Sequence, residues 1–421
     1  MPVFDETFRF SGFYIARRGM LIEFEVGNFR SFRDPAVLSL AAAGLNGHED
    51  NVFEAGRYRL LPSAALYGQN AAGKSNLLLA LVFMRNFVLA SSKDTQAKEP
   101  IYLEPFELDV GTREQPARFE VRFLLDGVTY RYGFEADRHR IRAEWLFQAT
   151  KIQETKLFTR ENQEIKVGTK FPEGVAFKAW TRENALFLSV VAQFNGPIST
   201  RILSWFNTMI LFHGLAKGRA TRSREMLESP KQKKKLMSLM KKADLNIQDL
   251  RIMKQPGEFI FMGSSAFLGS VHTLYDGDRR VDKVVLDFDA AESHGTKKFF
   301  QIAGPVLDAL EQGAVMIVDE FDSQLHPLLS LALLHLFHSP ETNPRHAQLI
   351  FATHDTLLLR HGRLRRDQIW FVEKDRQEGS RLYSLAEIKV RKDEAFDKNY
   401  LDGRYGAVPA PDLGNYLQDL P

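Results

Sequence analysis

SAALYGQNAAGKSN, residues 63–76, runs from an apolar segment through a loop of small residues into the start of a helix. Gly68 to Ser75 match the pattern G-x-x-x-x-G-K-[ST] in full, between a predicted strand and a predicted helix as a phosphate loop requires. Glycines let backbone N–H groups turn toward phosphate oxygens, and the helix N-terminus adds its positive end. We expect the nucleotide phosphates to be bound by Gly68, Gln69, Asn70, Ala71, Ala72, Gly73, Lys74, Ser75 and Asn76.

The last residues of this loop predict a nucleotide and its metal. Lys74 is expected to pair with the β and γ phosphates of ATP, and the Ser75 hydroxyl is expected to hold Mg²⁺. GTP is disfavoured because no Asn-Lys-x-Asp pattern, which reads guanine, occurs in the chain. A purely structural glycine-rich turn is the weaker alternative.

Two later segments supply polar residues at the ends of apolar strands. The run AVMIVDEFD, residues 314–322, predicts a buried strand that ends in Asp319 and Glu320. Strand ends of this kind are where α/β sheets bind ligands. Asp319 is expected to hold the Mg²⁺, and Glu320 to orient or deprotonate the attacking water. A second strand, in residues 348–352, is followed by His354, which can reach the γ-phosphate and respond to its presence.

The polar strip AESHGTKKFF, residues 291–300, lies about twenty residues before the strand that ends in the two acids. Ser293 can cap a helix that begins near Thr296. The backbone N–H groups of His294, Gly295 and Thr296 then form an anion cradle. The nucleotide site within the same chain already has a phosphate loop, so the strip is not a second loop for that site.

Periodicity indicates the remaining organisation. A strand begins at Met20, and an apolar helix runs through Leu77 and Met84. Residues 117–136 alternate around Asp126-Gly127 and predict a hairpin. Residues 182–255 are predicted to be helical. After residue 285, helices and strands alternate as in a parallel sheet with crossover helices.

Composition limits the class of protein. The chain of 421 residues has 44% apolar residues, a net charge of +3 and no cysteine, so disulfides and thiolate zinc sites are excluded. No apolar run approaches the roughly 18 residues of a membrane span, and we expect a cytoplasmic protein. The lysine run SPKQKKK, residues 229–235, predicts a solvated helix face rather than a nucleic-acid patch. His335 and His338, one helical turn apart, indicate surface or packing roles rather than zinc.

The order of these motifs resembles the ATP-binding-cassette class, which includes the SMC and double-strand-break-repair heads. The resemblance implies an α/β, ABC/SMC-head-like P-loop NTPase with a mixed sheet, an antiparallel β subdomain and an inserted helical subdomain. It also implies that Ser293 and Gly295 act in trans, so that a homodimer or higher homo-oligomer encloses ATP in composite sites. Two departures are the sequence Glu-Ser-His-Gly-Thr in the strip and the lack of an identifiable glutamine-loop residue before residue 200.

A closer resemblance is to the AAA15-type ATPases of phage-defence and abortive-infection systems, the group with the Rlo and PARIS ATPases. It is carried by NFRSF at 28–32, YGQNAAGKSN, ESHGT, DEFDSQLHP, THD and the segment RRDQIWFVEKD…YLDGRYGAVP. It implies an ATPase sensor and scaffold that controls a nuclease-like effector encoded nearby, with Asp322 and Ser323 in a loop that crosses the dimer seam. The alternatives are a DNA-repair or recombination head that acts directly on DNA, and a nucleotide-gated scaffold with little turnover.

These readings predict five segments. Residues 1–19 are an N-terminal extension, and residues 20–150 form the phosphate-loop lobe with the antiparallel β subdomain. Residues 151–285 form an inserted β/helical subdomain. Residues 286–410 carry the Ser-x-Gly strip, the acid-ended strand and the terminal-strand histidine, and residues 411–421 form a tail.

Overall fold

The computed structural model describes residues 19–45, 47–94, 96–213, 221–254, 266–360, 363–391 and 394–409. Within them, strands form a six-stranded, a seven-stranded, a three-stranded and a two-stranded sheet. The two-stranded sheet consists of β3 (Phe53–Ala55) and β4 (Tyr58–Leu60). None of the helices in the described part of the chain is both long enough and apolar enough to cross a lipid bilayer.

The six-stranded sheet lies at the centre of the molecule, with the strand order β11-β15-β16-β5-β17-β18. Neighbouring strands are parallel except β17 and β18, which are antiparallel, so the sheet is mixed. The predicted alternation after residue 285 is therefore confirmed. The strands are β5 (Ser63–Tyr67), β11 (Ile210–His213), β15 (Val315–Asp319), β16 (Gln348–Ala352), β17 (Ile369–Lys374) and β18 (Ser380–Ser384).

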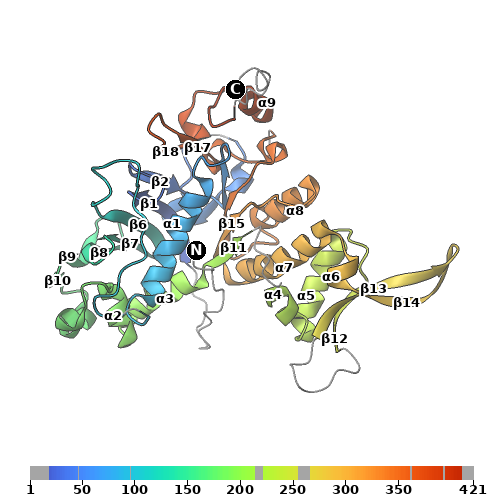
Figure 1. The fold of residues 1–421 in the computed structure, drawn as a ribbon, viewed down its shortest axis with the longest axis horizontal. Coiled ribbons are helices and arrows are strands. Elements are labelled where there is room, and N and C mark those ends of the chain that lie inside the picture. The colour runs from blue at the N-terminus through green and yellow to red at the C-terminus, as the bar shows by residue number, and fades with distance from the viewer. Residues whose placement is uncertain are drawn as a thin grey trace, which may run out of the picture.

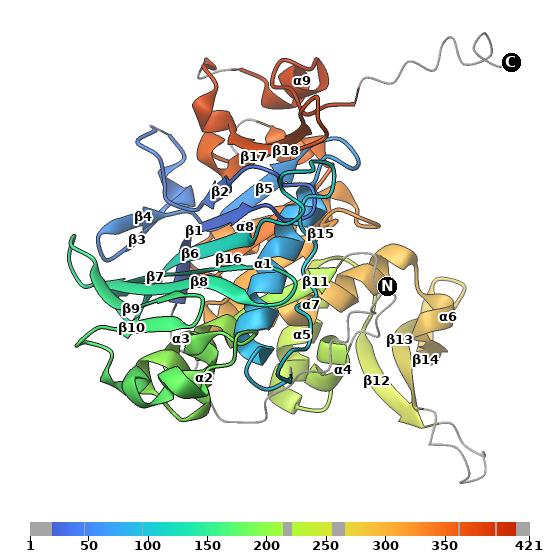
Figure 2. The ribbon, with the colours of Figure 1, turned by 60° about the vertical axis from the view of Figure 1, so that its left-hand side comes forward.

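Side chains on opposite faces of this sheet enter two separate cores, because successive residues of a strand point to opposite faces. In β5, Ala64 and Leu66 belong to one core, and Ala65 and Tyr67 belong to the other. The first core lies against the antiparallel sheet and three helices: α1 (Lys74–Ala90), α2 (Phe187–Gln193) and α3 (Pro197–Thr208). The second lies under α5 (Pro230–Lys242), α7 (His294–Gln312), α8 (Pro327–His338) and α9 (Phe396–Leu401). Figures 1 and 2 show this layering.

The seven-stranded sheet is antiparallel, with the order β10-β9-β8-β7-β6-β1-β2. The predicted hairpin is confirmed: Asp126 and Gly127 join β6 to β7, with φ of 51° and 79° as a tight hairpin turn requires. The strands are β1 (Gly19–Gly27), β2 (Ala36–Ser39), β6 (Ala117–Leu125), β7 (Val128–Ala136), β8 (Ile141–Ala149), β9 (Thr155–Glu161) and β10 (Glu164–Val167).

The helical prediction for residues 182–255 is correct for α2, α3, α4 (Thr221–Met226) and α5. It is wrong for β11 and for β12 (Asp249–Lys254). Four residues of β11 are too few to show a period, and their extended state comes from pairing with β15. The strands β13 (Ala266–Asp276) and β14 (Arg279–Asp287) form a hairpin that extends away from the molecule, followed by α6 (Phe288–Ala291).

Two lysines of the run in residues 229–235 bind acids of their own chain. The Lys233 ammonium lies 2.7 Å from a carboxylate oxygen of Asp249, and Lys235 pairs with Glu311 of α7. These contacts agree with a solvated helix face. His338 has a packing role, because its Nε2 lies 2.8 Å from the Ser63 hydroxyl.

The five-segment division stays a proposal, with one adjustment from the strand pairing. The predicted boundary at residue 150 falls between β8 and β9, which are neighbours in one sheet. We therefore place the end of the antiparallel subdomain after β10, near residue 167. Residues 1–18 and the tail at 411–421 lie outside the described residues.

Candidate functional site

The predicted site residues follow strands that end at the same edge of the central sheet. The strands β5, β15 and β16 are parallel, so their carboxyl ends lie side by side. The loop at 68–73 follows β5, Asp319 ends β15, and His354 lies two residues after β16. Ligands of α/β sheets bind at this kind of edge.

The loop after β5 has a backbone that glycine makes possible. Gly73 has φ of 117°, and a Cβ built on it would lie 2.2 Å from the Ser380 hydroxyl oxygen, so no larger residue fits there. Gly73 is also the N-cap of α1 and provides no side-chain cap. N–H groups of the first helical turn are therefore available to an anion.

Lys74 is held inside this loop, with 8% of its surface exposed. Its ammonium donates to the carbonyl oxygens of Gly68 and Gln69, at 2.8 and 3.1 Å. Burial lowers the pKa of Lys74, and the nearby Asp319, Asp322 and Glu320 act in the opposite direction. The sheet therefore brings the lysine of the loop into the electrostatic reach of the acids that follow β15.

The two acids have different backbone environments. Asp319 is the last residue of β15, and its carboxylate accepts the Glu320 N–H at 3.1 Å. Glu320 has φ of 51°, in the left-handed region that residues other than glycine rarely occupy. The next N–H, of Phe321, donates to Ala352 O of β16 at 2.9 Å. This turn strains the backbone. It bends the chain away from the direction of β15 directly after Asp319, the candidate metal ligand.

His354 is joined to the same loop. Its N–H donates to the Asp322 carboxylate at 3.2 Å, and the preceding Thr353 N–H donates to Leu66 O at 3.1 Å. Partial burial and the Lys74 ammonium lower the pKa of His354, although Asp322 and Asp319 act against this. A neutral imidazole in this place can donate or accept a hydrogen bond at a phosphate edge.

Ser293 is the N-cap of α7. Its hydroxyl oxygen accepts the Thr296 N–H at 3.1 Å, so the predicted cap is confirmed, although the helix begins at His294 rather than near Thr296. The cradle of three N–H groups needs correction. The Thr296 N–H is already engaged by the cap, which leaves those of His294 and Gly295.

The start of α7 lies apart from the phosphate loop of its own chain. The helix α7 packs on the opposite face of the central sheet from α1, and in Figures 1 and 2 it lies between α1 and α6. Gly295 instead faces the loop after Glu320, because a Cβ built on it would lie 3.2 Å from Gln324 O. One chain thus brings together the phosphate loop, Asp319, Glu320 and His354, and it leaves Ser293 and Gly295 elsewhere.

Additional residues contact the phosphate loop without having been assigned a role from the sequence. The Asn76 amide donates to the Ser31 hydroxyl at 2.8 Å, and the Ser380 hydroxyl donates to Ala72 O at 2.5 Å. The guanidinium of Arg30 lies 3.5 Å from the Asn76 amide oxygen. The NFRSF segment was the available signal for Arg30 and Ser31, whereas nothing in the sequence marks Ser380. The register of β11 with β15 places His213, the last residue of β11, beside Asp319. No sequence pattern pointed to this neighbour.

The donor set fits Mg²⁺. Ser75 in the first turn of α1 and Asp319 at the end of β15 offer a hydroxyl and a carboxylate, both oxygen ligands of the kind that Mg²⁺ prefers. Mg²⁺ is commonly held by one or two protein oxygens together with substrate phosphates and water. The coupling of Lys74 to Asp319 is consistent with a phosphate bound between them.

Comparisons with known proteins agree with this geometry. The family model for "AAA domain, putative AbiEii toxin, Type IV TA system" matches residues 63–360, which include the phosphate loop, both acids and His354. A search of curated proteins found no match.

Solved structures with a similar chain course include the SMC head domain from Thermotoga maritima, with 12% identity and a TM-score of 0.40 over 88% of this chain and 100% of that one. CbiO1 from Clostridium perfringens, part of the ABC transporter complex cbiONQ, has 11% identity and a TM-score of 0.31, covering 91% and 92%. The recombination mediator RecF with ATP has 16% identity and a TM-score of 0.31, covering 89% and 99%.

The predicted α/β class with a mixed sheet is confirmed by the strand pairing, and the match to an AAA domain agrees with it. The matched segment holds the complete set of site residues that the central sheet brings to one edge. This chain belongs to the family of AAA domains described as "putative AbiEii toxin, Type IV TA system", and it has the fold of a nucleotide-binding ATPase of that family.

Proposed function

We propose that the protein is a Mg²⁺-dependent ATP hydrolase that works as a dimer, with two ATP molecules enclosed between two copies. The observation that carries the proposal is that Ser293 and Gly295 start a helix on the opposite face of the central sheet from α1, where Gly295 lies beside the loop after Glu320. A second copy placed head to tail can supply that turn to the nucleotide. Such an arrangement gives two identical composite sites.

Each residue then has a defined task. N–H groups of the loop and the Lys74 ammonium bind the β and γ phosphates, while Ser75 and Asp319 hold the metal. Bound Mg²⁺ would neutralise phosphate charge. Glu320 orients and deprotonates the attacking water, and His354 contacts the γ-phosphate. Ser293 and Gly295 of the second copy donate to the same phosphate group, which completes the stabilisation of the developing charge.

The biological role that we propose is control of a nuclease-like effector in anti-phage defence, as in the Rlo and PARIS group of ATPases. The family description, which names a toxin and a toxin–antitoxin system, supports this context. The ion pairs of Lys233 and Lys235 with acids of the chain leave less basic surface for direct action on DNA. In this reading, closure of the dimer around ATP is the signal that the effector receives.

The trans arrangement is tested by mixing two inactive variants, Lys74→Ala and Ser293→Arg. Half of the randomly exchanged dimers contain one intact composite site, so turnover is expected to recover to at most about a quarter of the wild-type value, which is the value for two independent sites. The matched control mixes Lys74→Ala with Glu320→Gln. Both of these residues act on the nucleotide of their own chain, so no mixed dimer has an intact site and no recovery is expected.

The measurements are ATP turnover and subunit exchange, the latter followed with two fluorescent labels. An absence of recovery in the first mixture, with exchange demonstrated, would count against action in trans. Turnover that rises many-fold on addition of DNA, without any effector, would instead favour the DNA-repair role. Dimerisation with ATP but no turnover would favour a nucleotide-gated scaffold.

A further inference from the structure

Lys298, in the second turn of α7, is a buried lysine that the proposed chemistry has not used. Only 1% of its surface is exposed. Lysine is among the residues least often fully buried, because an ammonium group loses its hydration when it enters the interior. A buried ammonium of this kind requires compensating negative charge or aromatic faces nearby.

Both kinds of compensation are present. The Lys298 ammonium lies 5.0 Å from the ring centroid of Phe212 on β11, a cation–π contact. Phe212 is paired in register with Val318, the residue before Asp319. The side chain of Lys298 therefore reaches from α7 to the end of β15, directly before the two acids.

The acids in electrostatic contact with Lys298 are Glu320 and Asp322. Burial lowers the pKa of Lys298 to about 8, and Glu320 and then Asp322 oppose this by favouring the charged form. The lysine thus retains its proton at neutral pH and presents a positive charge to the carboxylate that we assign to water activation. Glu320 itself has the strained φ of 51°, so a charged partner can help to hold its orientation.

The first turn of α7 lies against the same loop. A Cβ on Gly295 would come within 3.2 Å of Gln324 O, four residues after Glu320. The loop at 320–324 therefore meets α7 twice, through backbone packing at Gly295 and through charge at Lys298. Gly295 belongs to the turn that we assign to the nucleotide of the other copy.

We propose that Lys298 is a positioning residue that holds Glu320 of its own chain, and that α7 thereby links each ATP site to the other. This inference rests on the proposed dimer, in which Ser293 and Gly295 engage the partner's nucleotide. A displacement of the α7 start by that nucleotide is transmitted along one turn of a rigid helix to Lys298. The orientation of Glu320 in one site then depends on occupancy of the other.

The first experiment compares full-length Lys298→Met, Lys298→Arg and wild type. Methionine retains the length and apolar stem of lysine but removes the charge that faces Glu320. We expect kcat for ATP hydrolysis to fall at least about tenfold, as is usual when a partner of a catalytic group is lost, with the Kd for a fluorescent ATP analogue changed by less than about threefold. Arginine should restore most of the turnover.

Lys235→Met is the matched control, because Lys235 also pairs with an acid of the chain, Glu311 on α7, but at an exposed position. It should leave kcat at the wild-type value. Turnover of Lys298→Met within about twofold of wild type would overturn the proposal. So would equal losses in kcat and in ATP affinity that arginine does not restore, because these indicate a structural role.

The second experiment distinguishes action in cis from action in trans. In a dimer of one Lys298→Met chain and one Lys74→Ala chain, the site with the intact phosphate loop lies on the chain that lacks Lys298. We expect no recovery above the Lys298→Met level, and recovery like that of Ser293→Arg with Lys74→Ala would overturn the cis assignment. Failure of the Ser293→Arg mixture would instead contradict the proposed dimer, while the kcat comparison would still decide whether Lys298 positions Glu320.

Discussion

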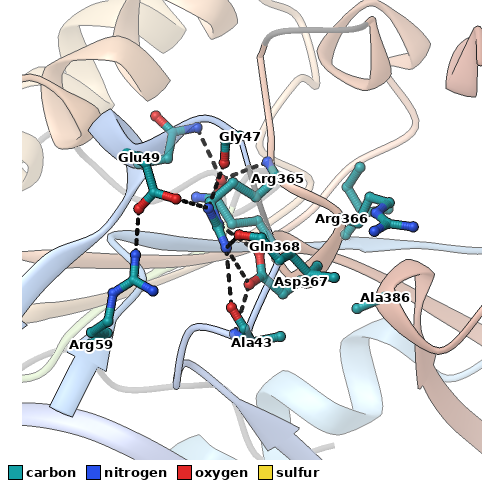
Figure 3. Close-up of polar contacts among 12 residues, drawn as sticks. Ala43, Gly47, Glu49, Arg59, Arg365, Arg366, Asp367, Gln368 and Ala386 are labelled. Atoms are coloured by element: carbon teal, nitrogen blue, oxygen red, sulfur yellow. Dashed lines mark hydrogen bonds and ion pairs between the residues drawn. The ribbon is translucent and has the colours of Figure 1, made fainter. Parts of the chain in front are cut away.

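At the scale of single residues, a buried arginine joins two segments more than 300 positions apart. Arg365, whose side chain is 2% exposed, donates from Nε to Asp367 Oδ1 at 3.0 Å and from Nη1 to Gly47 O at 2.6 Å. The Asp367 carboxylate also accepts the Ala43 N–H at 2.9 Å. Figure 3 shows this cluster between the segment at 43–49 and the residues that lead into β17. The pair ties the residues that lead into β17 to Ala43 and Gly47 of the N-terminal lobe.

Removing one partner of this pair should be costly, because the other charge stays buried. Asp367→Asn is expected to lower the free energy of unfolding by about 3 kcal/mol. Glu164→Gln is the control, since Glu164 pairs with Lys166 at an exposed position and should cost less than about 1 kcal/mol. Urea unfolding followed by circular dichroism measures both. Equal small effects would show that the buried pair contributes little.

His338 makes stability depend on pH. Its Nε2 contacts the buried Ser63 hydroxyl at 2.8 Å and the Gln368 amide nitrogen at 3.3 Å, and burial, with a contribution from His335, lowers its pKa to about 3. Because the folded pKa is below that of the unfolded chain, the unfolded state binds the proton first as the pH falls. The stabilisation is complete above about pH 6.5 and is lost progressively toward pH 3.

We expect His338→Gln to remove part of this pH dependence. Between about pH 7 and about pH 5.5, the wild type should lose about 1 kcal/mol more unfolding free energy than the variant does. The comparison of the two proteins isolates His338 from the other titrating groups, which are common to both. Parallel curves in denaturant titrations at the two pH values would contradict the assignment.

At the scale of elements, the C-terminal helix α9 supports the phosphate loop. The Tyr400 hydroxyl donates to Ala407 O at 3.2 Å. Its ring packs on Tyr67 and Phe371, with centroids 5.7 and 5.6 Å away. Burial raises the pKa of Tyr400 to about 12, so the hydroxyl remains protonated and able to donate. A segment far along the chain thus packs on Tyr67, the residue directly before the first glycine of the loop.

Tyr400→Phe should therefore weaken nucleotide binding. The variant leaves Ala407 O without this partner, at a cost of about 1 kcal/mol, and releases the anchor of the ring that packs on Tyr67, directly before Gly68. We therefore expect ATP affinity to fall several-fold. Tyr405→Phe is the matched control. The Tyr405 hydroxyl contacts Asn399 and Glu394 within the same segment, so its loss should affect stability but not affinity. Equal ATP affinity in both variants, by fluorescence titration, would contradict a role of α9 at the loop.

At the scale of the whole molecule, the proposed dimer should be captured by a variant that binds ATP but does not hydrolyse it. Glu320→Gln is expected to shift the protein from the mass of one chain to that of two when ATP and Mg²⁺ are added. Its turnover should fall by at least about a hundredfold. ADP should not produce the shift, because it lacks the γ-phosphate that the Ser293–Gly295 turn contacts. Light scattering measures the mass, and wild-type turnover in the variant would remove Glu320 from its role.

The sequence alone determined the features that depend on neighbouring residues. The strand, loop and helix at 63–90, the tight turn at Asp126-Gly127 and the cap at Ser293 were all predictable, since each rests on local backbone preferences and on side chains within about four positions. The acid-ended strand β15 and the strand before His354 were predictable as apolar runs. Most of the candidate site was therefore visible as motifs.

Only the tertiary structure decided which distant residues meet these motifs. The strand state of β11, the contact of Ser380 with the phosphate loop, the burial of Lys298 against Phe212 and the packing of Tyr400 on Tyr67 have no local signal. Each joins segments separated by tens to hundreds of residues, and such contacts are set by how the sheet and its covering helices pack. A single sequence carries the chemistry of these side chains, but the fold alone determines which of them become neighbours.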